Sequence, residues 1–204
     1  MRPGLPSGRV TFLFTDVEDS TKLLHELGPE RYAEALADHR RIVREAFAAH
    51  GGVEVDTQGD AFFVAFPTAA GALEAAAAAR ERLASGPIRV RIRIHTGRPH
   101  LADEGYVGID VHRAARIGAA GHGGQVVVSA ATAAEVSSAD LGELGEHRLK
   151  DFDEAVPLYQ LGDGEFPPLK TISTRTCRGR PARSSVGRRR SARSLCCCRT
   201  APDC

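Results

Sequence analysis

The pattern of apolar and polar positions predicts a chain in which short strands alternate with helices. Strands are expected where β-branched and aromatic residues gather or alternate with polar ones, at residues 10–14, 88–97, 125–128, 144–149 and 157–161 and in a hairpin over 53–66. Helices are expected where apolar residues recur on one face, at residues 20–27, 30–49, 68–84, 110–120 and 130–136. The resulting order, βααββαβαβαββ, predicts an α+β fold with helices on one side of a mostly antiparallel sheet. A ferredoxin-like βαββαβ core is the natural choice for that order.

The first predicted strand ends at Asp16, and a helix is expected to begin directly after it. Residues 17–21 (VEDST) offer helix-capping side chains before the apolar Leu23 and Leu24. Such a turn places a carboxylate at the edge of the sheet and directs the free amides of the new helix toward the same place. A hard cation that carries a phosphate group would fit there. The alternative is that Asp16 is only a turn residue and Ser20 only a cap.

A second aspartate lies at the tip of the hairpin predicted over residues 53–66. The turn reads Gln58-Gly59-Asp60, in which Gly59 is free to adopt positive φ, and a strongly apolar strand follows it. Two aspartates at strand ends, each beside a turn that exposes backbone amides, are what a two-Mg²⁺ phosphoryl-transfer site requires. The alternative is a surface hairpin in which Gly59-Asp60 only marks the turn.

The strand predicted over residues 88–97 alternates apolar and basic side chains, which indicates that one of its faces is in contact with water. Arg89, Arg91 and Arg93 are therefore expected on a solvated face. His95 is expected to be a structural histidine near the end of this strand, without a functional role.

The charge of the chain is divided unevenly along its 204 residues. Residues 1–170 hold 18 Lys and Arg against 25 Asp and Glu, a formal net charge of −7, whereas residues 171–204 hold nine Arg and one Asp, a net charge of +8. All five cysteines also lie in this last segment, and its three adjacent cysteines do not match the spacing of paired zinc ligands. We interpret the segment as a disordered tail that arises from a shifted reading frame of GC-rich DNA. A basic nucleic-acid-binding arm is the alternative.

No apolar stretch approaches the roughly 18 residues needed to cross a bilayer. The N-terminus also lacks the apolar segment of a secretory signal. A cytoplasmic protein with no membrane partner is therefore expected. We interpret residues 1–8 as a flexible leader, 9–162 as one folded domain, 163–170 as a linker and 171–204 as the tail.

Four segments together resemble the class III adenylate and guanylate cyclase homology domain. They are residues 14–21 (FTDVEDST), 57–66 (TQGDAFFVAF), 105–116 (GYVGIDVHRAAR) and 123–129 (GGQVVVS). They occur in the family's order and with its spacing, over residues 8–161. The resemblance implies a ferredoxin-like fold and a homodimer that converts ATP or GTP to the 3′,5′-cyclic nucleotide and pyrophosphate in intracellular signalling. It also implies two Mg²⁺ or Mn²⁺ ions in each site.

The resemblance further implies roles for individual residues. Asp16, Asp60 and the backbone carbonyl of Val17 would hold the metal ions. Arg116 would stabilise the charge that builds on the α-phosphate in the transition state. Binding of the β- and γ-phosphates is implied for the amides of Glu18, Asp19, Ser20 and Thr21, which the predicted helix start suggests independently, and phosphate binding is implied for the side chain of Lys150.

Three positions depart from the family's pattern. Asp56 replaces the purine-selecting lysine, Gly105 replaces its partner, and His112 replaces the ribose-positioning asparagine. Asp56 could accept a hydrogen bond from guanine N1–H or from the adenine amino group, and His112 can still donate one. These departures keep a second function open, a catalytically weak or inactive nucleotide-binding module that regulates a truncated multidomain protein of the ATPase or transcription-regulator type. No specific nucleic-acid partner is expected.

Overall fold

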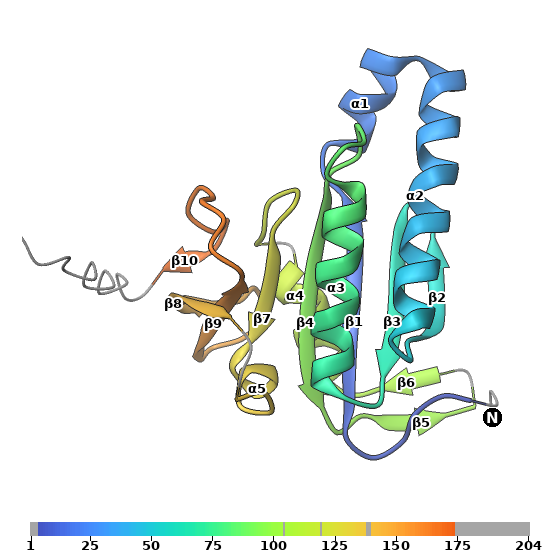
Figure 1. Cartoon of the computed structure of the whole chain (residues 1–204). Helices are drawn as coiled ribbons and strands as arrows, with labels where there is room; N and C mark the ends of the chain where they lie inside the picture. Colours follow the sequence, from blue (N-terminus) through green and yellow to red (C-terminus); the bar gives the residue numbers. More distant parts are fainter. Residues whose placement is uncertain (1–3, 104, 119, 138–139, 174–204) are drawn as a thin grey trace, which may run out of the picture.

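The computed structural model describes residues 4–103, 105–118, 120–137 and 140–173. Within these ranges the chain forms an eight-stranded sheet with the order β10-β8-β9-β7-β4-β1-β3-β2 (Figure 1). The strands are β1 (Val10–Val17), β2 (Val53–Gln58), β3 (Ala61–Phe66), β4 (Val90–Gly97), β7 (Val126–Ser129), β8 (Leu141–Arg148), β9 (Ala155–Leu161) and β10 (Ile172–Ser173), with a separate hairpin of β5 (His100–Ala102) and β6 (Gly105–Val107). The helices are α1 (Ser20–Leu27), α2 (Pro29–Ala49), α3 (Ala69–Leu83), α4 (Ile109–Gly118) and α5 (Ala130–Ala133). None of the helices in these ranges is long and apolar enough to cross a membrane.

The half of the sheet that runs from β4 to β2 has the topology of a ferredoxin-like core. Its strands lie in the order β4-β1-β3-β2 and are antiparallel to their neighbours, and α2 and α3 make the two crossovers of a βαββαβ unit. β7 pairs with β4 in parallel, and β9, β8 and β10 continue the sheet in antiparallel order. The predicted α+β fold with a mostly antiparallel sheet is therefore confirmed.

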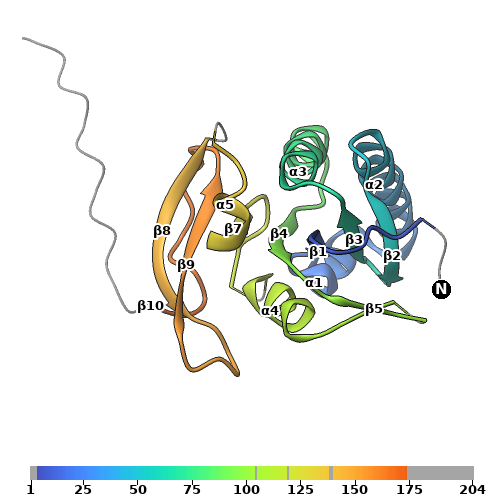
Figure 2. The ribbon, with the colours of Figure 1, turned by 90° about the horizontal axis from the view of Figure 1, so that it is seen from below.

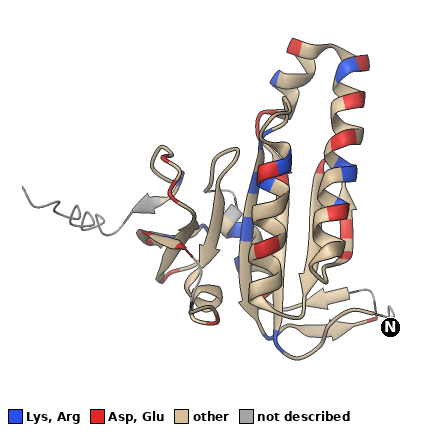
Figure 3. Ribbon diagram, viewed as in Figure 1, with Lys and Arg blue, Asp and Glu red and all other residues tan. Residues whose placement is uncertain are grey.

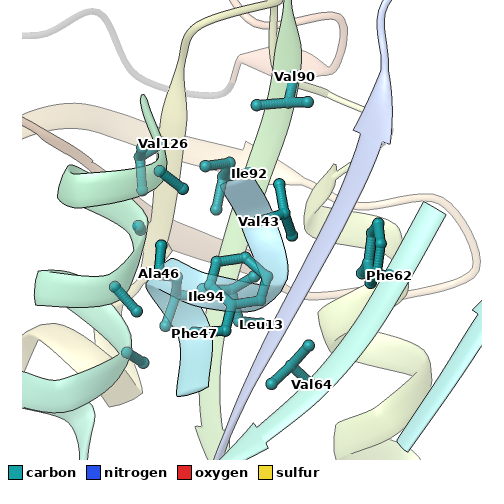
Figure 4. Close-up of a cluster of buried hydrophobic side chains, with 14 of the residues drawn as sticks. Leu13, Val43, Ala46, Phe47, Phe62, Val64, Val90, Ile92, Ile94 and Val126 are labelled. Atoms are coloured by element: carbon teal, nitrogen blue, oxygen red, sulfur yellow. The ribbon is translucent and has the colours of Figure 1, made fainter. Parts of the chain in front are cut away.

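α2 and α3 cover one face of this core (Figures 1 and 2). Branched and aromatic residues of β1, β3 and β4 pack there against Val43 and Phe47 of α2 (Figure 4). α3 contributes short side chains to the same cluster, and the wholly buried ones are Ala72, Ala75, Ala76 and Ala79. Because these side chains are short, α3 can lie close to the sheet without leaving cavities.

The opposite face is covered by α4 and by the β5–β6 hairpin (Figure 2). Ala114 of α4 and Tyr106 of β6 belong to one buried cluster with Phe12, and the Tyr106 and Phe12 rings meet edge to face with centroids 5.0 Å apart. The prediction that the helices lie on one side of the sheet is therefore wrong. Phe12 belongs to the cluster on this face and Leu13 to the cluster under α2 and α3. A strand that is apolar on both faces needs cover on both.

The chain after β9 stays in contact with the domain. The backbone N–H of Lys170 donates to the carbonyl of Ala120 at 2.8 Å, and Leu169 is only 8% exposed. The segment predicted as a linker, 163–170, thus packs on the fold. The tail predicted from residue 171 begins with β10, which pairs with β8. The rest of the predicted tail, 174–204, and the first three residues of the predicted leader lie outside the described ranges.

Candidate active site

β1 ends in a tight turn that leads directly into α1. Asp16 and Val17 are the last two residues of β1, and α1 begins at Ser20. Asp19, the N-cap residue, adopts a left-handed conformation with φ 52° and ψ 37°, which an aspartate tolerates better than most residues. The first turn of α1, whose amides have no partner within the helix, therefore opens next to the strand end that carries Asp16.

The Asp16 carboxylate is bound by two arginines of β4. Arg91 Nε donates to Oδ1 at 2.5 Å, and Arg93 Nη1 donates to Oδ2 at 3.2 Å. β1 and β4 pair with Asp16 opposite Arg91, so the sheet register brings these side chains together; Figure 3 shows the basic residues of β4. The Arg93 side chain is only 12% exposed, and its guanidinium lies 5.3 Å from the centre of the Phe14 ring.

The prediction of a solvated face for all three arginines of this segment is therefore wrong. Burial lowers the pKa of Arg93, although the neighbouring Asp16 charge acts in the opposite direction. Arg91 is only partly exposed. Arg89 alone lies at the surface, where its guanidinium donates to two backbone carbonyls.

His95, also on β4, is buried and joins three elements. Its Nδ1 lies 2.9 Å from Ser129 Oγ of β7, and its Nε2 lies 3.4 Å from Asp110 Oδ1 of α4. Burial lowers the pKa of His95, while Asp110 acts in the opposite direction. These contacts give His95 the structural place that the sequence predicts for it.

Asp60 lies in the turn between β2 and β3, at the same end of the sheet as Asp16. The antiparallel pairing of β1 and β3 runs as far as Thr15 opposite Phe62. The backbones of Asp16 and Asp60, just beyond this pair, therefore lie at the same end of the two strands. Arg40 of α2 holds the turn by donating to the carbonyl of Gly59 at 2.7 Å.

The charge of Asp60 acts on residues of α2. Burial raises the pKa of Tyr32 and Asp60 raises it further, while a hydrogen bond with Ser20 lowers it. Burial lowers the pKa of His39 to about 4, although Asp60 acts in the opposite direction. The structure therefore places Asp16 and Asp60 at the same end of the sheet, where Asp16 lies beside the arginines of β4 and Asp60 acts on residues of α2. We call Asp16, Asp60 and residues 19–22 the α1 edge.

The described residues contain no group of three or more His, Cys, Asp or Glu that could hold a metal ion. In phosphoryl-transfer sites, however, Mg²⁺ is held by one or two carboxylates together with the phosphates of the substrate. Asp16, Asp60 and the carbonyl of Val17 are hard oxygen donors of this kind, so they fit a metal ion that arrives with a triphosphate. A cation at Asp16 would have to compete with the positive charges of the two arginines that hold its oxygens.

An open depression of about 590 Å³ surrounds the first turn of α1. It is lined by Val17, Asp19, Ser20, Thr21, Lys22, His25, Glu26 and Arg91. Free amides at a helix start favour the binding of anions. The two basic side chains of the lining are paired, Lys22 with Glu26 and Arg91 with Asp16, so the phosphate-binding roles of Asp19, Ser20 and Thr21 stay predictions that rest on the amides.

Glu18 has a different place. Its backbone N–H donates to the carbonyl of Arg89 at 2.9 Å, so the phosphate-binding role predicted for this amide does not fit the structure. Its carboxylate accepts a hydrogen bond from the N–H of Gly123 at 2.9 Å and lies 3.4 Å from Lys170 Nζ. Burial alone would raise the pKa of Glu18, but these two hydrogen bonds prevail and lower it. Glu18 thus fastens the turn to the loop before β7.

Next to α4 lies a basic cavity of about 600 Å³, bordered by the loop between β8 and β9. Arg116 and Lys150 both line it, together with Arg148. Arg116 Nη2 pairs with Asp151 Oδ2 at 2.6 Å. His112 is exposed on α4 one helical turn before Arg116. The structure therefore brings Arg116 and Lys150 to one cavity, in which Asp151 is the present partner of Arg116.

The two base-selecting positions line one open cleft of about 1020 Å³, the base cleft, between β2 and the β5–β6 hairpin. Asp56 Oδ2 accepts a hydrogen bond from Gln58 Nε2 at 2.9 Å. Gly105 has φ 138°, and a Cβ atom there would meet only Val55 Cγ1, at 3.9 Å. The backbone conformation, and not lack of space, accounts for glycine at this position.

The α1 depression, the basic cavity and the base cleft have no lining residue in common. Sequence reasoning predicted residues in all three but missed Arg91 and Arg93 as partners of Asp16. The regular alternation of arginine along β4 was the visible signal. That β4 lies beside β1 was not visible, because the paired residues are far apart in the chain.

Residues 5–161 match the family model of the adenylate and guanylate cyclase catalytic domain. An uncharacterised protein of Mycobacterium tuberculosis is 41% identical over 197 residues, which covers 90% of this chain and 68% of that protein. An adenylate cyclase of Podospora anserina is 32% identical over 162 residues, which covers 64% of this chain and 8% of that protein.

Solved structures share the fold. An adenylate cyclase of Trypanosoma brucei in its monomeric state matches with a TM-score of 0.75 at 27% identity, and the match covers 85% of this chain and 98% of that chain. An adenylyl cyclase of P. aeruginosa matches with a TM-score of 0.68 at 22% identity, over 78% of this chain and 95% of that chain. The second likeness shows the fold alone.

Proposed function

Because the chain belongs to the adenylate and guanylate cyclase catalytic domain family, as the resemblance predicts, we propose that it converts a purine nucleoside triphosphate to the 3′,5′-cyclic nucleotide and pyrophosphate. The observation that carries this proposal is the α1 edge, where two carboxylates and the first turn of α1 lie at the same end of the core. Carboxylates for a divalent cation and amides for phosphates are the groups that the triphosphate half of this reaction needs.

When bound, two Mg²⁺ or Mn²⁺ ions would lower the pKa of the ribose 3′-hydroxyl and neutralise the triphosphate. The chain's own residues would orient the substrate around that chemistry. The first-turn amides of α1, with Lys22, would hold the β- and γ-phosphates. Arg116 and Lys150 would stabilise the charge that builds on the phosphate during transfer. His112 would donate a hydrogen bond to the ribose.

A homodimer would bring these parts into one site. Within a single chain the α1 edge, the base cleft and the basic cavity are separate, and this separation supports a site that two copies share. Val107, which lines the base cleft, and Ile109, the first residue of α4, are 50% and 61% exposed, and a dimer would cover them. With two-fold symmetry the α1 edge of one copy would face the base cleft and basic cavity of its partner.

ATP and GTP are both candidate substrates. The ionised Asp56 side chain can only accept hydrogen bonds, either from guanine N1–H or from the adenine amino group, and Gly105 adds no side chain to the cleft. The two nucleotides therefore have to be compared in one assay.

The full chain is expected to release a cyclic nucleotide from ATP or GTP in the presence of Mn²⁺, measured by chromatography at high protein concentration. Arg116→Ala should lower kcat by about 10²–10³-fold. Arg148→Ala, in the same cavity, is the matched control and should lower it by less than about tenfold. Both positions are exposed, so melting curves should show that both variants fold. No cyclic product from either nucleotide would reject catalysis.

A nucleotide-binding module without turnover is the second candidate function. The departures at Asp56, Gly105 and His112 favour it, and so do the ion pairs of Asp16, which oppose metal binding. Such a module would regulate a longer protein of the ATPase or transcription-regulator type. Calorimetry with ATP, GTP and Mn²⁺ would identify it, if nucleotide binds to a chain that yields no cyclic product.

A further inference from the structure

Building on the function proposed above, which takes Asp16 as a metal ligand, we propose that Arg93 is a built-in counter-ion of Asp16. In the nucleotide-free chain Arg93 holds the carboxylate, and a divalent cation must compete with its positive charge. Arg93 thereby makes metal binding at the α1 edge depend on the arrival of a triphosphate.

Both oxygens of Asp16 are engaged. Oδ1 accepts from Arg91 Nε at 2.5 Å and Oδ2 accepts from Arg93 Nη1 at 3.2 Å. A cation that coordinates Asp16 must share the carboxylate with these two guanidiniums. It also brings its own positive charge next to theirs, in a place where only 23% of the Asp16 side chain is exposed and water screens charges weakly.

The two arginines differ in how freely they can leave Asp16. Arg91 is 24% exposed and lines the depression at the start of α1, so its guanidinium can turn toward phosphates there. Arg93 is 12% exposed, does not line that depression and lies over the Phe14 ring. Its Nε has no hydrogen-bond partner among the described residues. Arg93 is therefore the arginine that depends on Asp16 for its counter-charge.

This difference has a consequence for the order of binding. A metal ion alone meets two guanidiniums at Asp16 and should bind weakly. A triphosphate offers Arg91 new anionic partners and adds negative charge around Arg93, so metal and nucleotide should bind together. Removal of the Arg93 charge should tighten binding of the metal alone, while Asp16 keeps Arg91 as a partner.

Mn²⁺ binding to the full chain without nucleotide, followed by the paramagnetic resonance signal of free Mn²⁺, tests this proposal. Arg93→Met is expected to tighten binding about tenfold or more. Arg89→Met is the matched control, because it removes the same charge two residues earlier from a side chain that contacts backbone carbonyls and not Asp16. It should change Mn²⁺ affinity about twofold or less. If Arg93→Met binds no more tightly than Arg89→Met, the proposal is overturned.

Two further variants keep the test decisive. Arg93→Gln keeps a polar side chain, should show the same gain, and carries the test if Arg93→Met does not fold. Asp16→Ala added to the Arg93 variant should abolish the gain; a gain that survives without Asp16 overturns the proposal. Metal binding and turnover are measured in separate assays. If Mn²⁺ affinity rises in the Arg93 variants only when Asp16 is present, but the natural chain makes no cyclic nucleotide, catalysis is rejected and the role of Arg93 stands.

Discussion

The α1 edge and the base cleft belong to one domain but are built differently. The α1 edge is the end of core strands whose residues Leu13, Val17 and Phe62 are at most 4% exposed, and its Asp16 pairs with two arginines of β4. The base cleft lies between β2, whose pairing is irregular next to Asp56, and a hairpin of two three-residue strands. In the proposed cyclase the core would therefore fix the triphosphate chemistry, whereas base recognition would rest on elements that can change without disturbing the core.

Asp16→Ala should have the largest effect, because it alters the α1 edge in two ways. Loss of the carboxylate should lower cyclase activity by about 10³-fold. It should also destabilise the fold by about 3 kcal/mol, since it removes one partner of the largely buried Arg93. Assays of activity and urea denaturation measure the two effects. Asp38→Ala, an exposed carboxylate of α2, is the control. If Asp16→Ala stayed active, the α1 edge would not be the catalytic region.

The buried His39 of α2, which the charge of Asp60 reaches, should make the stability of the fold depend on pH. Burial lowers its pKa to about 4 from an ordinary 6.5, so the fold favours the neutral imidazole. The stability that the fold gains from a neutral His39 is fully present above pH 6.5. It is lost as the pH falls toward 4, because the unfolded chain then binds more protons than the folded chain. The loss should approach about 3 kcal/mol.

Thermal or urea unfolding across this pH range measures the effect. In His39→Leu the stability should fall less than in the natural chain between pH 6.5 and 4. Equal pH dependence of the two proteins would show that the imidazole is charged or hydrated in the fold.

Ala76→Leu tests how tightly the face under α3 is packed. Ala76 is wholly buried, so three additional carbon atoms should force α3 away from the sheet and cost about 1–3 kcal/mol. Urea denaturation measures the loss. Ala70→Leu on the exposed side of α3 is the matched control and should change stability by less than about 0.5 kcal/mol. Equal stability of the two variants would mean that the core under α3 accommodates a larger side chain as easily as the exposed side of the helix does.

Asp56→Asn should have the smallest effect, and one confined to the base cleft. The amide can donate as well as accept hydrogen bonds, so the ratio of kcat/KM for ATP and GTP should change about tenfold. Stability should stay constant, because Asp56 is exposed. Glu54→Gln on the same strand, where the carboxylate pairs with Arg44, should leave the ratio unchanged. A constant ratio in Asp56→Asn would remove Asp56 from base recognition.

Much of the fold could be predicted because its signals are local. The apolar spacing predicts a helix over residues 20–27, where α1 lies, although no side chain caps its N-terminus. At α3, Thr68 does cap the helix by accepting a hydrogen bond from the N–H of Gly71. The continuous apolar run of β1, which includes Phe12 and Leu13, also indicates that both faces need cover, although the predicted fold has helices on one side only.

The site could be predicted only in part, because its contacts join distant segments. Asp16 and Arg91 are 75 positions apart, and no periodicity shows that β1 and β4 are neighbours. The amide of Glu18 looked free in the sequence, yet the carbonyl of Arg89 accepts its hydrogen. Arg116 and Lys150 line one cavity. The family resemblance singled out both residues, whereas their spacing in the sequence gives no sign that they are close in space.

The most direct test is to mix two variants that are each expected to be inactive, Asp16→Ala at the α1 edge and Arg116→Ala in the basic cavity. If one copy supplies the α1 edge and its partner the basic cavity, mixed dimers contain one intact site. An equal mixture should then recover roughly a quarter of the natural activity. No recovery, in a mixture whose chains are shown to exchange by native mass spectrometry, would contradict a site shared between two copies.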